Sequence, residues 1–93
     1  MHMIKTIFDV VKQRRLKPQD GSYTSYLQKE GIDKILKKLG EEATETVIAA
    51  KNPVPVRLIQ EMADLYYHTI VLMEAYGITP DQVNNELEKR HKS

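Results

Sequence analysis

The chain has 93 residues, of which 41% are hydrophobic and 29% charged, with a formal net charge of +1. This length predicts one domain over residues 1–93, and because so short a chain buries only about 60–65% of its unfolded surface, pairing with a second copy would stabilise it. The absence of cysteine excludes disulfides, thiolate metal sites and a cysteine nucleophile, as suits a reducing compartment.

Neither a membrane span nor a signal peptide is expected. Apolar runs such as Ile70–Met73 are far shorter than the roughly 18 residues that a membrane helix needs. We therefore expect a soluble, cytoplasmic protein and interpret Met1-His2-Met3 as a cloning remnant. Residues 1–38 carry nine basic and four acidic side chains, whereas residues 39–93 carry five and nine. This asymmetry suits either nucleic acid or a polyanionic ligand held through a divalent metal.

The apolar residues recur with helical spacing from the start of the chain. Ile4, Ile7, Phe8 and Val11 predict a first helix over residues 3–15. A loop follows at 18–21, and residues 22–30 form either a short helix, ended by a glycine, or an ordered loop.

Two longer helices follow. The stripe from Ile32 to Ala50 predicts a helix over 32–51, ended by the prolines at 53 and 55. A second helix is predicted over 56–76, and Thr79 caps a last one over 80–91. The fold class is all-α, a bundle of four or five helices with two long central antiparallel helices, completed by dimerisation.

Acidic residues repeat the same three-residue step on both long helices, as Glu42 with Glu45 and Glu61 with Asp64. At 100° per residue, the second pair falls in one sector about 60° wide together with Arg57 and His68. The helix around this sector is mostly apolar and is expected to be buried. Buried carboxylates are costly unless they are paired with cations or bind metal.

The pair on the first long helix lies on the flank of its apolar stripe, with Lys38. A short connection makes the two helices antiparallel neighbours, so all four carboxylates can converge between them. Four carboxylates form a site for a hard cation, Mg²⁺ or alternatively Mn²⁺, with positions left for phosphate oxygens. A ferritin-like di-iron site is disfavoured because it needs Glu-x-x-His, whereas the third positions here are Glu45 and Asp64.

Each of these features also has a plainer explanation. The glutamates alone suit a solvated face, and the carboxylates together could form salt bridges with Arg57 or Lys38. His68 either orients Asp64, takes part in proton transfer, or is a core histidine satisfied by a hydrogen bond. Gly40 lies inside a predicted helix, where it either allows a substrate or a partner backbone to approach closely or is simply tolerated by the helix. The lysines Lys34 and Lys37 either bind phosphate or are solvated surface charges. A second group of side chains suits either the core or a dimer interface: Met62, Tyr66, Tyr67 and Met73.

Three sequence blocks match a known family: Lys38-Leu39-Gly40-Glu41-Glu42-Ala43-Thr44-Glu45, then Ala49-Ala50-Lys51, then Glu61-Met62-Ala63-Asp64-Leu65-Tyr66-Tyr67-His68. The chain resembles the phosphoribosyl-ATP pyrophosphohydrolases of histidine biosynthesis, within the all-α NTP pyrophosphohydrolase (MazG-like) superfamily. The superfamily signature is E-E-x-x-E followed by E-x-x-D on the next helix. The likeness covers most of the chain, from Ser25 to Arg90.

The resemblance implies hydrolysis of phosphoribosyl-ATP to phosphoribosyl-AMP and pyrophosphate by a nucleotide-binding homodimer or larger homo-oligomer, with no nucleic acid or membrane partner. It implies that magnesium is held by Glu42, Glu45, Glu61 and Asp64. Glu41 matches the first signature glutamate and is assigned a secondary role, on a second metal or in activating water. Three basic residues occupy family-like positions and are candidates for binding substrate phosphates: Lys38, Lys51 and Arg90. Arg90 could come from the same or from the second subunit.

Two alternatives remain open. A house-cleaning NTP pyrophosphatase would have the same metal site and act on another nucleotide. A non-enzymatic helical module would use the carboxylates structurally and the basic first half to bind a partner or nucleic acid.

Overall fold

The computed structural model describes residues 2–52 and 54–91 of the chain, which form five α-helices and no strand. The helices are α1 (His2–Leu16), α2 (Tyr23–Glu30), α3 (Ile32–Lys51), α4 (Pro55–Ala75) and α5 (Pro80–His91). Met1 of the suspected remnant and Pro53 of the predicted helix end lie outside the described residues. The all-α prediction is confirmed, and none of the five helices is long and apolar enough to cross a bilayer.

The segment left open between helix and loop is a helix. Ser22 is the N-cap residue of α2, and its hydroxyl accepts a hydrogen bond from the Ser25 amide at 3.1 Å. Gly31 ends α2 at a φ of +95°, a conformation that side chains rarely adopt, and α3 begins at the next residue. A single glycine therefore sets the turn between α2 and α3.

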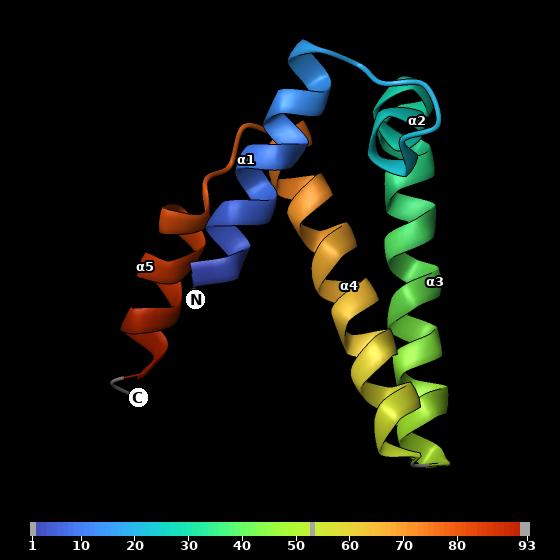
Figure 1. Ribbon diagram of the computed structural model, residues 1–93. Coiled ribbons are helices and arrows are strands. Elements are labelled where there is room, and N and C mark those ends of the chain that lie inside the picture. Colours follow the sequence, from blue (N-terminus) through green and yellow to red (C-terminus); the bar gives the residue numbers. More distant parts are fainter. Residues whose placement is uncertain (1, 53, 92–93) are drawn as a thin grey trace.

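The helices α3 and α4 run antiparallel as a long pair, with α2 at one end of α3 and α1 crossing the second half of α4 (Figure 1). The core lies where these four helices meet and consists of Val11, Leu27, Ile35, Ile70 and Val71, each at most 2% exposed. The helix α5 contributes no buried residue and packs beside α1. Thr79 and Gln82 cap it reciprocally, each side chain accepting from the other's amide.

One expectation about α4 is wrong for this chain. We expected a helix so apolar to be buried along its length, but its buried residues all belong to the second half: His68, Ile70, Val71 and Met73. The first half has no cover from α1 or α5 (Figure 1). Consequently Glu61 is half-buried and Asp64 is exposed.

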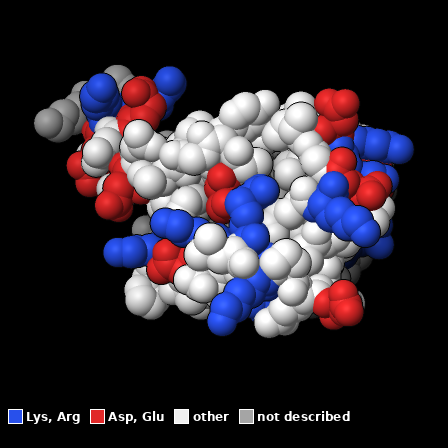
Figure 2. Space-filling model, turned by 90° about the horizontal axis from the view of Figure 1, so that it is seen from above, with Lys and Arg blue, Asp and Glu red and all other residues white. Residues whose placement is uncertain are grey.

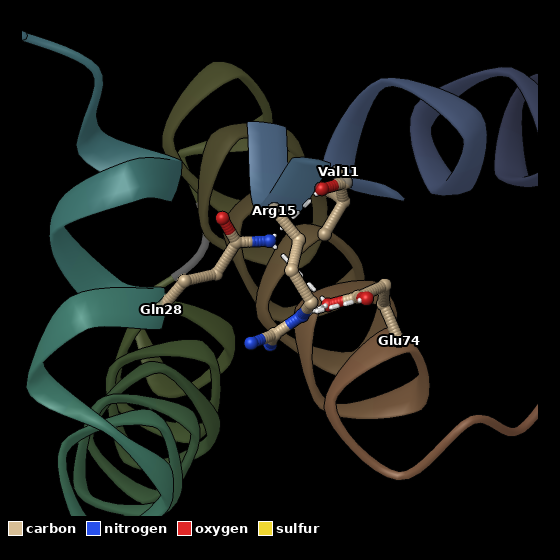
Figure 3. A network of polar contacts seen from close by, with 4 residues as sticks. All are labelled: Val11, Arg15, Gln28 and Glu74. Carbon is tan, nitrogen blue, oxygen red and sulfur yellow. Dashed lines mark hydrogen bonds and ion pairs between the residues drawn. The ribbon is translucent and has the colours of Figure 1, made fainter. Parts of the chain in front are cut away.

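A polar network joins the helices beside the core (Figure 3). Arg15 of α1 donates from Nε to both carboxylate oxygens of Glu74 of α4 at 2.8 Å. Gln28 of α2 donates from its amide nitrogen to the Val11 carbonyl at 2.9 Å and to Glu74 at 3.4 Å. The Glu74 side chain is only 8% exposed, so these donors compensate a nearly buried charge. The network fixes α1 and α2 to the covered end of α4.

Candidate active site

The acidic residues of α3 and α4 line a groove of about 550 Å³. Within it, carboxylate oxygens of Glu42, Glu61 and Asp64 lie within 4.8 Å of one another. The sequence predicted this convergence of α3 and α4. The groove is lined by Lys38, Gly40, Glu41, Glu42, Thr44, Glu45, Glu61 and Asp64.

The other two acidic residues of the predicted site face cations instead. Glu45 lies 3.9 Å from the Arg57 guanidinium, and Glu41 lies 3.7 Å from the Lys38 ammonium. Both pairs are partly exposed and at the outer limit of ion-pair distance, so each contributes little to stability. Glu45, predicted as a fourth metal ligand, thus lines the groove without joining the cluster of three.

Electrostatics within the cluster favour a bound cation. Burial is the largest cause that raises the pKa of the Glu42 carboxyl, and the neighbouring Asp64 and Glu61 raise it further, although His68 and Lys38 oppose them. Three hard oxygen donors that repel one another are the ligand set that Mg²⁺ or Mn²⁺ prefers. The residues present therefore fit the predicted metal.

The backbone behind the carboxylates is held by a residue that the sequence did not single out. The Thr46 hydroxyl of α3 lies 2.8 Å from the Glu42 carbonyl and 3.3 Å from the Glu61 carbonyl of α4. This hydroxyl bridges the two helices at the level of the acidic cluster. A threonine four residues after a glutamate is ordinary in a helix, so only the packing of α4 reveals the bridge.

His68 is a satisfied core histidine, 5% exposed. Its Nδ1 donates to the main-chain carbonyl of Asp64 at 2.7 Å, because a carbonyl can only accept. Its Nε2 shares a hydrogen bond with the Tyr23 hydroxyl at 2.8 Å. The ring therefore contacts the backbone of Asp64 and not its carboxylate. Tyr23 was absent from the sequence prediction, since no local pattern reports a contact between residues 45 positions apart.

Two of the predicted phosphate-binding residues lie outside the groove. Lys51 is exposed at the end of α3, and Arg90 belongs to α5, on the other side of α4 from α3 (Figure 1). Arg90 is 3.3 Å from Glu86 of its own helix. Lys38 is the one residue of this predicted trio that lines the groove. Gly40 lines it too, and a Cβ added there would meet no described atom within 4 Å apart from its chain neighbours and its own helix backbone, so the space in front of it is open.

The profile of the family described as phosphoribosyl-ATP pyrophosphohydrolase matches residues 4–91. The chain belongs to this family. The family's acidic signature coincides with the groove, because Glu41, Glu42, Glu45, Glu61 and Asp64 all line it.

Individual relatives are similar over almost the whole chain. A phosphoribosyl-ATP pyrophosphatase of Lactiplantibacillus plantarum is 49% identical over 90 residues, which cover 97% of this chain and 85% of that protein. One of Lacticaseibacillus casei is 53% identical over 87 residues, 94% of this chain and 79% of that protein. The histidine biosynthesis bifunctional protein HisIE of Oceanobacillus iheyensis is 50% identical over 91 residues, 98% of this chain but only 42% of that protein. The chain therefore spans less than half of the bifunctional relative and most of the other two.

Proposed function

We propose that this protein hydrolyses phosphoribosyl-ATP to phosphoribosyl-AMP and pyrophosphate in histidine biosynthesis, with Mg²⁺, or alternatively Mn²⁺, as cofactor. One observation carries the proposal: in a member of this family, three carboxylates from two helices meet within 4.8 Å in an open groove. Two of the relatives named above are called phosphoribosyl-ATP pyrophosphatases. We expect the reaction to take place in the cytoplasm, where nucleotides and magnesium are abundant.

Each acidic residue has a role that follows from its position. Glu42, Glu61 and Asp64 hold the metal, and Glu45 joins them when it leaves its weak pair with Arg57. A metal held by these carboxylates would supply the charge that neutralises the triphosphate and would lower the pKa of a water molecule for in-line attack on phosphorus. Glu41 has a secondary role in orienting or deprotonating that water, or in holding a second ion. Lys38 leaves Glu41 to bind a substrate phosphate as a point charge.

The role of His68 is to fix α4 from behind the site. Its two hydrogen bonds link α2 to the backbone of Asp64. A ligand residue held in this way keeps its position when the metal and substrate arrive.

The active form is a homodimer or a higher homo-oligomer. One stripe of α4 is buried under α1 at Ile70 and Met73, but its continuation is bare, with Ile59 65% and Tyr66 47% exposed. Val47 of α3 is 61% exposed. An isolated domain this small gains from covering such a surface, and a second copy of the same hairpin is self-complementary to it. Because Arg90 is remote from the groove of its own chain, the partner supplies it.

The test is release of pyrophosphate from phosphoribosyl-ATP compared with a panel of ordinary and damaged nucleoside triphosphates, with Mg²⁺ and then with a chelator. We expect a magnesium-dependent preference for phosphoribosyl-ATP. Preference for another triphosphate would instead assign the protein to the house-cleaning branch, and hydrolysis of none would return the carboxylates to a structural role.

The alternative of a nucleic-acid-binding module finds little support in the surface. On the face seen in Figure 2, basic side chains lie in several separate places, interspersed with acidic and uncharged ones. Nucleic-acid sites are typically continuous basic patches. The basic excess of residues 1–38 does not form one on this face.

A further inference from the structure

Two tyrosines of α2 lie half-exposed outside the acidic groove, and Tyr26 lines a separate hollow beside residues 18–22. Tyr23 is 44% exposed and Tyr26 47% exposed, and their rings stack with centroids 6.3 Å apart and planes 27° from parallel. Exposed aromatic faces of this kind bind nucleobases by stacking. Neither ring contributes to the buried core.

The position of Tyr23 is fixed, which suits a binding surface. Its hydroxyl shares a hydrogen bond with His68, and its ring makes an edge-on contact with the His68 ring at 5.6 Å. The next residue, Thr24, is buried and hydrogen-bonded to the Tyr67 hydroxyl of α4. Because α2 is held on α4 at two adjacent residues, its tyrosines lose little further freedom when a ligand binds.

The tyrosines lie at the basic end of one flank of α3. Successive turns of this flank carry Lys34, Lys38, Glu42 and Glu45. Lys34 places its ammonium 5.8 Å from the centre of the Tyr26 ring. Burial raises the pKa of the Tyr23 phenol, while the Lys38 charge lowers it and Glu42 raises it, so both groove residues are within electrostatic reach of that ring.

This order of charges matches the chemistry of the proposed substrate. Phosphoribosyl-ATP carries a triphosphate on one side of its adenine ring and a second ribose phosphate on the other. The acidic, metal-binding turns suit the triphosphate, and a lysine suits the second phosphate. Lys34 and Glu42 are eight residues apart, or about 12 Å along a helix, which leaves room for a nucleoside between them.

We propose that Tyr23 and Tyr26 stack on the adenine ring of the substrate and that Lys34 binds the phosphate of its second ribose. The inference rests on the proposed function and deepens it. It explains how the enzyme distinguishes phosphoribosyl-ATP from ATP. The metal site cannot make this distinction, since it contacts the triphosphate that both molecules share.

The experiment measures binding without turnover, by calorimetric titration of phosphoribosyl-AMP and of AMP into the wild type and four variants. Lys34→Ala removes the proposed phosphate contact, and Lys37→Ala is its control on the same helix. Tyr26→Leu removes the stacking ring, and Tyr26→Phe keeps it. Tyr26 is preferred to Tyr23, whose hydroxyl also holds His68.

We expect Lys34→Ala to raise the Kd of phosphoribosyl-AMP roughly 10-fold or more, as for a charge-assisted hydrogen bond, and to leave the Kd of AMP unchanged. Tyr26→Leu should raise both Kd values by about 5- to 100-fold, the range for stacking on one base. Tyr26→Phe and Lys37→Ala should bind both nucleotides as the wild type does. In turnover, Lys34→Ala should raise KM for phosphoribosyl-ATP with little effect on kcat.

The opposite results would overturn the inference. The first is a wild type that binds phosphoribosyl-AMP no more tightly than AMP. The second is a Lys34→Ala variant in which the Kd values of both nucleotides change equally or not at all. The third is a Tyr26→Leu variant that binds both nucleotides as Tyr26→Phe does. Titration separates this failure from failure of the proposed function. An enzyme that hydrolyses phosphoribosyl-ATP but shows one of these patterns keeps its function and loses this recognition surface.

Discussion

The α3–α4 pair exposes two surfaces of opposite character. One is the groove, where Glu42, Glu61 and Asp64 lie together. The other is the apolar surface that includes Val47, Ile59 and Tyr66, each of them at least 47% exposed. Neither surface stabilises a monomer, because the carboxylates of the groove repel one another and the apolar side chains are exposed to water. We propose that each surface is completed from outside the chain, the groove by a cation and its nucleotide, and the apolar surface by a second copy.

Loss of a carboxylate from the groove should have the largest effect on activity. We expect Asp64→Asn to reduce magnesium-dependent hydrolysis of phosphoribosyl-ATP by at least about 100-fold, because a metal ligand stabilises transition-state charge by several kcal/mol. The metal-free variant should be as stable as the wild type or slightly more so, since Asp64 is exposed and its charge is repelled by its neighbours. Steady-state assays and thermal melts with a chelator measure the two effects.

Glu45→Gln tests the proposed fourth ligand against this change. Glu45 lines the same groove but pairs with Arg57 outside the cluster of three. Its loss should therefore reduce activity less than loss of Asp64. Equal effects of the two substitutions would show that Glu45 is a full ligand in the loaded enzyme.

A charge on the apolar surface should separate the subunits. We expect Ile59→Asp to raise the dissociation constant of the dimer by more than about 100-fold. A twofold-symmetric interface contains the substitution twice, and each buried side chain contributes roughly 1.5–3 kcal/mol. Analytical ultracentrifugation measures the mass in solution. Leu16→Asp is the control, since Leu16 is also highly exposed but lies at the end of α1. A wild type that is monomeric at micromolar concentration would refute the proposed oligomer.

Helical periodicity was enough to predict the fold. Spacing and caps located four of the five helices to within a residue or two, whereas residues 22–30 were left open between a helix and a loop. The burial of α4 was not predictable in the same way. The apolar character of Ile59 and of Ile70 is the same in the sequence, but Ile59 is 65% exposed and Ile70 only 2% exposed, in the core where four helices meet.

The site could be predicted in part for a related reason. Residues three or four apart share a helix face, so the pairing of Glu61 with Asp64 was readable from spacing alone. The division of five acidic residues into three clustered and two paired depends on side-chain positions across two helices. The Thr46 bridge and the Tyr23–His68 hydrogen bond each join two helices, and the sequence alone does not show how those helices are placed against each other.

A smaller effect, on stability alone, is expected at the covered end of α4. Glu74→Ala should lower the free energy of unfolding by about 1–3 kcal/mol, because it leaves Arg15 without its acceptor and the Gln28 amide with the Val11 carbonyl alone. Glu86→Ala, which breaks the exposed pair with Arg90 within α5, should cost less than about 0.5 kcal/mol. Urea denaturation of both variants compares them. Equal losses would mean that the network in Figure 3 contributes no more than a surface ion pair.

The smallest effect is the pH dependence of the metal-free groove. Burial, with Asp64 and Glu61 nearby, raises the pKa of Glu42 in the folded chain above its value in the unfolded chain, so folding favours the protonated form. The stabilisation is complete below the unfolded pKa and is lost as the pH rises through the folded pKa. In the presence of a chelator, the free energy of unfolding should therefore fall slightly as the pH rises through this weakly acidic window. The Glu42→Gln substitution should remove that fall. Magnesium should reverse the trend, because it binds the deprotonated carboxylate and stabilises the fold increasingly as protons leave. A Glu42→Gln variant with the same pH profile as the wild type would assign the dependence to another group.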